Sequence, residues 1–447
     1  MSRLNGAGLE TVAAVAAPGS AADAIAAAGA YAESVADGTI ERDRAGATRP
    51  PVEELARLDA SGLMAITVPR AFGGPELGAA VLAEVIATIA AVDPALAQAP
   101  QGHFLLSDVL AVWGAGEPQR RLFAEVLDGG RIGNALAERG GLHAQDLKTR
   151  LHGWPRRVPG DGGTRGDGGP GAAGSRTEDG PRGEGGPRGE GGPRLRGRKY
   201  YTTGSLTARW IGVSALDDDG ALVLAFVRRD APGVGLDTDW NVMGQRATVS
   251  GSATFDDVLV DPELVIPYAR AFEVPQQLGA RAQLVHTAIQ VGIARGALRD
   301  ARWFVRDKAR PFFEAARAGW TDSAASDPHT VYRFGQLATR VRAAEALLAS
   351  AAATLDEVGR VPASAAEAAR GSIAVAQAKA FASEVATEVA SGLFELSGAS
   401  AADEKYDLSR HWRNARTHAS HDPVSWKYHH IGEFMLNDIL PPNHGQL

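Results

Sequence analysis

Apolar residues recur every three to four positions along several stretches of the first 130 residues. In PPVEELARLDASGLMAI (50–66), Leu55, Leu58 and Leu63 share one side of a helix that begins with prolines and carries acids in its first turn. VLAEVIATIAAVDPALAQ (81–98) and EPQRRLFAEVLDGG (117–130) are also helical; the former is interrupted before Pro94 and the latter stops at glycines. The pattern predicts an N-terminal helical domain over residues 1–130.

The pattern changes at about residue 131, where short apolar runs are separated by Gly, Asp and Pro. ALVLAFVRR (221–229) and SATFDDVLV (252–260) have the length and the β-branched or aromatic content of strands. We therefore predict a small, barrel-like β domain over 131–268. Residues 155–197 interrupt it with repeats of PRGEGG, which cannot bury apolar surface and should form a disordered, solvated loop insertion.

Helical spacing returns after residue 280 and persists through several turns at a time. Apolar residues keep this spacing at Val331, Phe334, Leu337, Val341, Ala344, Leu348 and Ala351, and again at Ile373, Ala376, Ala380, Val385, Val389 and Leu393. Long amphipathic helices with short connections pack as an antiparallel bundle. The chain is therefore predicted to be α+β and mostly α, with a C-terminal four-helix bundle over 269–447.

The composition of the chain excludes several kinds of site and partner. The chain of 447 residues has no cysteine, which excludes disulfides, cysteine nucleophiles and thiolate metal sites. A net charge of -7 provides no general positive field, so neither nucleic acid nor an anionic membrane is expected as a partner. The first residues, MSRLNGAGLE, show no basic region that leads into an apolar one, so we expect no secretion signal. No uncharged apolar run is long enough to span a bilayer, and we expect a cytoplasmic protein.

Several segments together resemble the acyl-CoA dehydrogenase family. They are LDASGLMAITVPRAFGGPELG (58–78), GNALAER (133–139), KYYTTGS (199–205) and MGQRATVSGSATFDDVLV (243–260). The C-terminal stretch HWRNARTHASHDPVSWKYHHIG (411–432) is similar to one branch of that family, the reduced-flavin-dependent monooxygenases that include dibenzothiophene and sulfur-acquisition enzymes. The resemblance covers nearly the whole chain except the Gly/Arg insertion.

That branch implies a two-component monooxygenase. Reduced FMN, supplied by a separate flavin reductase, would react with O2 to give a C4a-hydroperoxide that oxygenates a small, largely apolar substrate at sulfur, carbon or nitrogen. Two alternatives stay open: an acyl-CoA dehydrogenase-like oxidoreductase with bound FAD, and a non-catalytic scaffold. A dehydrogenase needs a carboxylate base, but the expected positions hold Thr417, His418 and His421, or Ala282 and Gln283.

His418 and His421 are the main catalytic candidates. Three residues apart on one helical turn, they would project to the same side, and imidazole titrates near neutrality. By resemblance, one holds the oxygenated flavin and the other relays a proton, and His103 matches a further histidine of the branch. As an alternative, the pair could be structural partners of Asp422 at a helix end. No metal site is expected, because a third and a fourth ligand are missing.

The cofactor-binding candidates also come from the resemblance. Asn134, Leu136 and Ala137 lie in a segment that matches a flavin-contacting strand, and Tyr201, Thr202 and Thr203 lie in a second one; the Thr203 hydroxyl would bond near flavin N5. Arg310 and Phe312 match residues that reach the flavin of a neighbouring subunit, so a homotetramer is implied.

Overall fold

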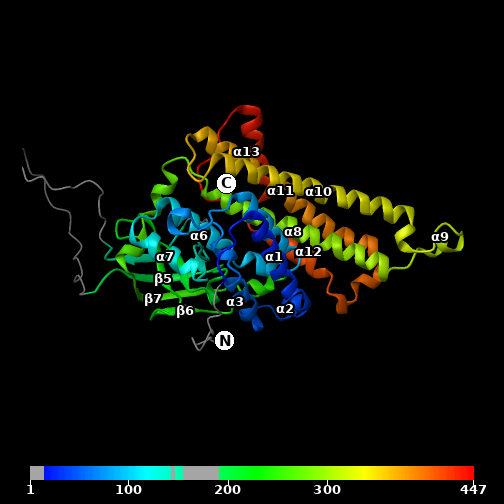
Figure 1. Ribbon diagram of the computed structural model, residues 1–447, viewed down its shortest axis with the longest axis horizontal. Coiled ribbons are helices and arrows are strands. Elements are labelled where there is room, and N and C mark those ends of the chain that lie inside the picture. Colours follow the sequence, from blue (N-terminus) through cyan, green and yellow to red (C-terminus); the bar gives the residue numbers. More distant parts are fainter. Residues whose placement is uncertain (1–14, 142–145, 155–190) are drawn as a thin grey trace, which may run out of the picture.

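The N-terminal third of the protein is helical, as Figure 1 shows for the computed structural model, which describes residues 15–141, 146–154 and 191–447. Its helices are α1 (Ala21–Val35), α2 (Thr39–Ala45), α3 (Val52–Ala60), α4 (Ala79–Ala90), α5 (Pro94–Gln98), α6 (Gln101–Trp113) and α7 (Glu117–Leu127). The predicted helices are confirmed as α3, α4 and α7. Asp93 caps α5 by accepting hydrogen bonds from Ala95 and Leu96, which explains the break before Pro94.

A mixed sheet follows. Its strands are β1 (Ile132–Ala135), β2 (Arg150–His152), β3 (Arg194–Lys199), β4 (Trp210–Leu216), β5 (Leu222–Arg228), β6 (Val234–Leu236), β7 (Ala253–Leu259) and β8 (Val265–Ile266). The strand order is β6-β7-β3-β2-β4-β5-β8, and β1 pairs in parallel with β4. The predicted strands over 221–229 and 252–260 are confirmed as β5 and β7.

The predicted end of the Gly/Arg insertion at residue 197 is wrong. Strand β3 begins at Arg194, and its Leu195 is fully buried opposite Val258 of β7. One apolar side chain that fills a core position is enough to extend the sheet into a glycine-rich segment. Strand β2 pairs antiparallel with β3, so the insertion joins the two strands of a hairpin; its residues 155–190 lie outside the described part.

The C-terminal part is a helical bundle. Its helices are α8 (Leu278–Asp307), α9 (Phe313–Arg317), α10 (Pro328–Val358), α11 (Ala365–Ser397), α12 (Ser409–Ala419) and α13 (Val424–Asn437). The apolar positions predicted over 373–393 are all buried on α11. On α10 the buried face begins only at Leu337, and Val331 is 54% exposed, because the start of α10 extends beyond the packed part of the bundle.

Helix α8 joins the parts of the molecule. It packs against α10 and α11 within the bundle and against α4 and α6 of the N-terminal part. At Gly292 an added Cβ would lie 2.4 Å from Ala90 Cβ, so glycine permits a close crossing of α8 and α4. The far ends of α8 and α10 extend away from the sheet to α9 (Figure 1). No helix in the described ranges is both long and apolar enough to cross a membrane.

Candidate functional site

Three histidines from distant parts of the chain meet where α8, α12 and the turn after α12 come together. His286 Nδ1 lies 3.2 Å from His418 Nε2. The ring of His286 also lies against the ring of His421, with centroids 4.1 Å apart and planes inclined by 35°. His286 and His418 are 3% and 2% exposed, whereas the side chain of His421 is 41% exposed. The cluster therefore has a buried side and an accessible side.

His421 does not lie on the same helix as His418, contrary to the prediction. Helix α12 ends at Ala419, and the backbone N–H of His421 donates to the carbonyl of His418 in a turn. Pro423 follows, and the residue before a proline is disfavoured in helical conformation, so the helix cannot continue through this stretch. The two rings are brought together by His286, whose ring contacts both.

The two buried histidines are neutral near pH 7. Burial lowers the pKa of His286 and of His418 well below the ordinary value, and the neighbouring Lys379 cation lowers both further. His418 Nδ1 lies 3.0 Å from Gln98 Oε1 and 3.4 Å from Gln245 Nε2. Because each amide group and each imidazole offers a donor and an acceptor, the ring of His418 has partners in either tautomer.

Asp422 is the carboxylate next to this cluster, and it is already engaged. Its Oδ1 lies 2.8 Å from Lys379 Nζ and 3.3 Å from His421 Nδ1, and its Oδ2 lies 2.9 Å from Lys427 Nζ. Burial alone would raise its pKa, but the hydrogen bond with His421 and the two lysines hold the pKa of Asp422 below its usual range. A carboxylate in this state is a weak base and is not free to take a proton from a substrate.

Lys379 is the buried cation of this group. Its Nζ also donates to Gln283 Oε1 at 2.6 Å, and its side chain is 1% exposed. Burial lowers the pKa of Lys379 to about 8, although Asp422 opposes that change. Lys379 is therefore charged at neutral pH, and the ion pair holds the turn that carries His421.

His103 has a different environment from the one expected for a catalytic group. Its ring is fully buried, Nε2 lies 2.8 Å from the carbonyl oxygen of Met64, and Nδ1 accepts from the backbone N–H of Ile132 at 3.2 Å. Burial lowers its pKa to about 4. Because both nitrogens are used by the backbone, neither is free for a flavin or a substrate, and His103 holds α6 against β1 and the turn at Met64.

The cofactor-binding candidates of the β domain gather around the ends of β1 and β3. The backbone N–H of Asn134 donates to the carbonyl of Thr203 at 3.4 Å, and the Thr202 hydroxyl donates to the carbonyl of Gly251. Leu136 and Ala137 continue from β1 and are partly buried. Tyr201 is 49% exposed and has a φ of 59°, a strained conformation for a non-glycine residue.

A loop after β6 connects these residues with the histidines. Gln245 and Val249 both have positive φ, 53° and 45°, and for a β-branched residue this is strained. The backbone N–H of Gln245 donates to Asn414 Oδ1 on α12, which fixes the loop to the helix of His418. Gln245 Oε1 is buried without a hydrogen-bond partner in the described part of the chain.

Arg310 and Phe312 lie far from both groups. They occupy the exposed connection between α8 and α9, at the end of the molecule opposite the sheet (Figure 1). Phe312 is 62% exposed, and Phe313, which packs against it, is 58% exposed. Within one chain these residues cannot reach the flavin candidates of the β domain.

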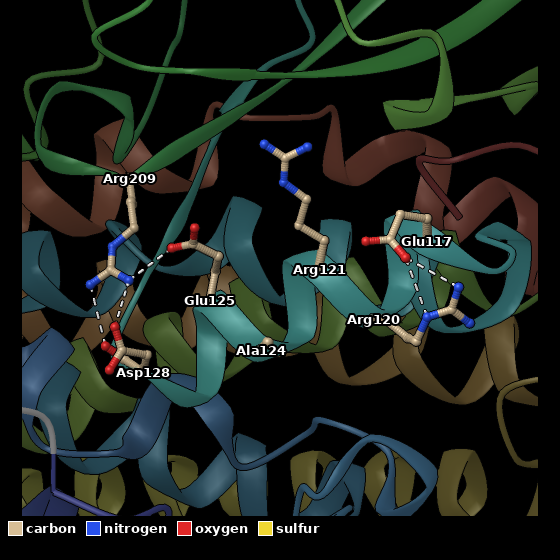
Figure 2. Close-up of a pocket in the computed structure, with 7 residues that line it drawn as sticks. All are labelled: Glu117, Arg120, Arg121, Ala124, Glu125, Asp128 and Arg209. Carbon is tan, nitrogen blue, oxygen red and sulfur yellow. Dashed lines mark hydrogen bonds and ion pairs between the residues drawn. The ribbon is translucent and has the colours of Figure 1, made fainter.

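A pocket of about 650 Å³ on α7 is unrelated to these groups. Figure 2 shows that charged side chains line it and are paired with one another: Arg120 with Glu117, and Arg209 with Glu125 and Asp128. Arg121 binds Asp261 at 3.1 Å. The large volume lies over an open surface that is lined mostly by charged side chains.

Three functional candidates have no signal that the sequence motifs could reveal. His286 lies within an apolar helical run, QLVHTAIQV, where one histidine is most simply a core residue. Lys379 lies on the buried face of α11. Gln245 lies in the segment 243–260, which resembles the family but did not indicate a role for Gln245 itself. In the sequence, His286 lies one turn after Ala282 and Gln283, the positions where a dehydrogenase would carry its base.

Comparisons with known proteins agree with this architecture. Residues 23–130 match the model of the acyl-CoA dehydrogenase N-terminal domain, and residues 284–426 match that of the C-terminal domain. A dibenzothiophene monooxygenase of Mycolicibacterium goodii is 31% identical over 90% of this chain and 91% of its own. A probable FMNH2-dependent monooxygenase, SfnC of Pseudomonas putida, is 29% identical over 90% of this chain and 92% of its own. The crystal structure of FMN-bound TdsC from Paenibacillus sp. A11-2 aligns with a TM-score of 0.82 and 27% identity, covering 95% of this chain and all (100%) of that chain.

Proposed function

Since this chain belongs to the acyl-CoA dehydrogenase family, in the branch of its flavin-dependent monooxygenases, we propose that it uses reduced FMN and O2 to oxygenate a small, largely apolar substrate. A separate flavin reductase would supply the reduced FMN. Several relatives of this chain are named for dibenzothiophene, and two TdsC structures contain indole, so both compounds are suitable trial substrates.

The observation that carries the proposal is the chemistry of the histidine cluster. Three imidazoles lie together, and the carboxylate beside them, Asp422, is occupied by Lys379 and Lys427. Removal of a substrate proton followed by hydride transfer needs a free carboxylate base. Delivery of a proton to a departing oxygen needs a donor beside it; burial lowers the pKa of His421, so this imidazole gives up a proton readily once it carries one.

The residues around Thr203 fit a flavin ring. Thr203 and Asn134 are 7% and 9% exposed and lie next to each other at one end of the sheet. Gln245 Oε1, buried without a partner in the described part of the chain, is a further acceptor for a ring N–H. Asn134, Thr203 and Gln245 would hold the ring, with Leu136, Ala137, Tyr201 and Thr202 around them. When bound, reduced FMN would supply the electrons that activate O2.

The histidines then have distinct tasks. His421 is the partly exposed member and would donate the proton, because it can exchange with solvent. His286 stacks against it and hydrogen-bonds to His418, so these two hold His421 in place and can pass a proton between buried nitrogens. Burial of His286 and His418 keeps water from the reacting atoms on their side. His103 acts through the backbone as a positioning residue.

The assembly we propose is a homotetramer in the cytoplasm. The tip of α8 and α9 carries Arg310 beside the exposed rings of Phe312 and Phe313, with the exposed Trp320 nearby in sequence. A guanidinium group is suited to a phosphate, and an aromatic ring to the face of a flavin. Since this tip is remote from the β domain of its own chain, it would complete the flavin site of a neighbouring subunit.

The decisive experiment measures the transfer of oxygen to the substrate. We expect the wild-type protein, given reduced FMN, O2 and dibenzothiophene or indole, to yield oxygenated product, and His421→Ala to lower that yield by roughly 100-fold or more and release H2O2 instead. His152→Ala, at a side chain of β2 that is 55% exposed, is the matched control and should leave the yield unchanged. Anaerobic bleaching of bound flavin by an acyl-CoA, or full yield in His421→Ala, would contradict the proposal.

A further inference from the structure

A buried row of hydroxyl groups leads from Thr203 towards the histidine cluster. Thr203 Oγ1 lies 2.6 Å from Ser250 Oγ, and Ser250 Oγ lies 2.8 Å from Thr248 Oγ1. Thr248 Oγ1 lies 2.9 Å from the backbone carbonyl oxygen of Gln245. The three hydroxyl residues are 7%, 2% and 4% exposed, so bulk water does not compete for these bonds.

The direction of each hydrogen bond in this row is fixed from its inner end. A carbonyl oxygen carries no proton, so Thr248 must donate to Gln245. Each hydroxyl has one proton, so Thr248 has none left and must accept from Ser250. By the same reasoning Ser250 must accept from Thr203, whose single proton is then committed.

Thr203 Oγ1 therefore turns only lone pairs towards a ligand. Within the part of the chain that the structure describes, Ser250 is the one hydrogen-bond partner of Thr203 Oγ1. A ligand atom that donates a hydrogen bond would be stabilised there, and a ligand atom with a lone pair of its own would be repelled. A buried mismatch of this kind weakens binding by roughly tenfold.

We infer that the Thr203–Ser250–Thr248 row selects reduced over oxidised flavin. The inference rests on the proposed function and on the family resemblance, which implies that the Thr203 hydroxyl lies beside flavin N5. In reduced flavin N5 carries a hydrogen and can donate to Thr203, whereas in oxidised flavin N5 has only a lone pair. Ser250 and Thr248 are then specificity-determining residues, although they need not touch the flavin.

Such selection suits an enzyme that takes its flavin from solution. The reduced form must enter although the oxidised form accumulates with every turnover. Because the row is buried and ends on a backbone carbonyl, its direction does not depend on pH or on the orientation of a mobile side chain. The strained Gln245 backbone is part of this arrangement, since it places the carbonyl that fixes the direction.

The test compares the Kd values of oxidised and reduced FMN, measured without O2 by titration of flavin fluorescence and absorbance. We expect wild-type protein to bind the reduced form at least about tenfold more tightly. Ser250→Ala frees the Thr203 proton for N5, so this preference should fall by about tenfold, mainly through tighter binding of oxidised FMN. Thr248→Val should act in the same direction, because Ser250 can then donate to Thr203.

Two controls separate this effect from general damage. Thr248→Ser keeps the hydroxyl and should keep the preference, and Thr254→Val removes an exposed hydroxyl of β7 outside the row. Equal Kd values for the two forms in wild-type protein, or an unchanged preference in both Ser250→Ala and Thr248→Val, would overturn the inference and leave the proposed function standing. Absence of binding of either form would instead overturn the proposed function itself.

Discussion

His103 and His418 are both almost completely buried, and both have a lowered pKa, yet their surroundings differ in kind. The partners of His103 are a backbone carbonyl, which can only accept, and a backbone N–H, which can only donate. They fix one tautomer, with the proton on Nε2. The partners of His418 are two glutamine amides and an imidazole, which together allow either tautomer.

The difference teaches that burial and a depressed pKa do not by themselves identify a reagent. A histidine with one partner that can only accept and one that can only donate has a structural role, because moving its proton to the other nitrogen would break two hydrogen bonds. A histidine whose partners can reverse their roles can pass a proton on. By this criterion we propose the cluster of His286, His418 and His421 as the reactive region and His103 as a support of the scaffold.

The largest effect should follow from His418→Leu. The substitution removes both ring nitrogens from the proton path, so oxygenated product should fall by roughly 100- to 10,000-fold. Reduced FMN should still bind, because the hydroxyl row around Thr203 is intact. Stopped-flow measurement of product and H2O2 provides the readout. A variant that retains full product yield would remove His418 from the reactive region.

A loss of stability should follow from His103→Ala. The carbonyl of Met64 and the N–H of Ile132 would be left buried and unpaired, at a cost of roughly 1–3 kcal/mol each. Urea unfolding at pH 7.5 measures this cost, and His103→Gln should restore part of it, because an amide can serve both partners. If the variant is as stable as wild-type protein but inactive, His103 is a reagent after all.

Acid should act on the scaffold through the same residue. Burial lowers the pKa of His103 from 6.5 to about 4, so between these values the unfolded chain binds a proton that the folded chain does not. Above pH 6.5, His103 takes nothing from the stability of the folded protein. As the pH falls towards 4, the free energy of unfolding decreases by up to about 1.4 kcal/mol per pH unit. His286 and His418 add to this in the same direction. In His103→Gln, the free energy of unfolding, measured with urea at several pH values, should decrease less steeply as the pH falls.

The smallest effect is expected from Gln98→Leu. His418 Nδ1 would keep Gln245 as a partner but lose Gln98, so one tautomer would be favoured over the other. Product formation should fall by less than about tenfold, the value of one hydrogen bond. Steady-state rates with saturating reduced FMN measure it. A loss as large as that of His418→Leu would mean that His418 works in one fixed tautomer, as His103 does.

Local patterns in the sequence predicted several helices and two of the candidate histidines. Helical spacing located the helices α3, α4, α7, α10 and α11, and the motif in 411–432 located His418 and His421. Family resemblance placed Thr203 in a flavin-contacting segment, which is still a prediction for this chain.

Contacts between distant residues could not be predicted in the same way. Thr203 and Ser250 are 47 residues apart, and His286 and His418 are 132 residues apart. The direction of each hydrogen bond in the Thr203–Ser250–Thr248 row depends on all members of the row, so it could not be predicted from any one of these residues. Family resemblance gave His103 as a catalytic candidate because of its position in the sequence. Its hydrogen bonds with two backbone groups, which the structure shows, indicate a structural role instead.

The pairing of His152 with Arg194 has a practical consequence. The two ends of the long Gly/Arg segment are held side by side by the sheet, so lengthening the segment adds only a slowly growing loop-closure entropy, about 0.6 kcal/mol per doubling. The same position could therefore receive a whole reductase by genetic fusion. A tethered donor would deliver reduced flavin at high local concentration, so that oxygenase and reductase would work as one polypeptide.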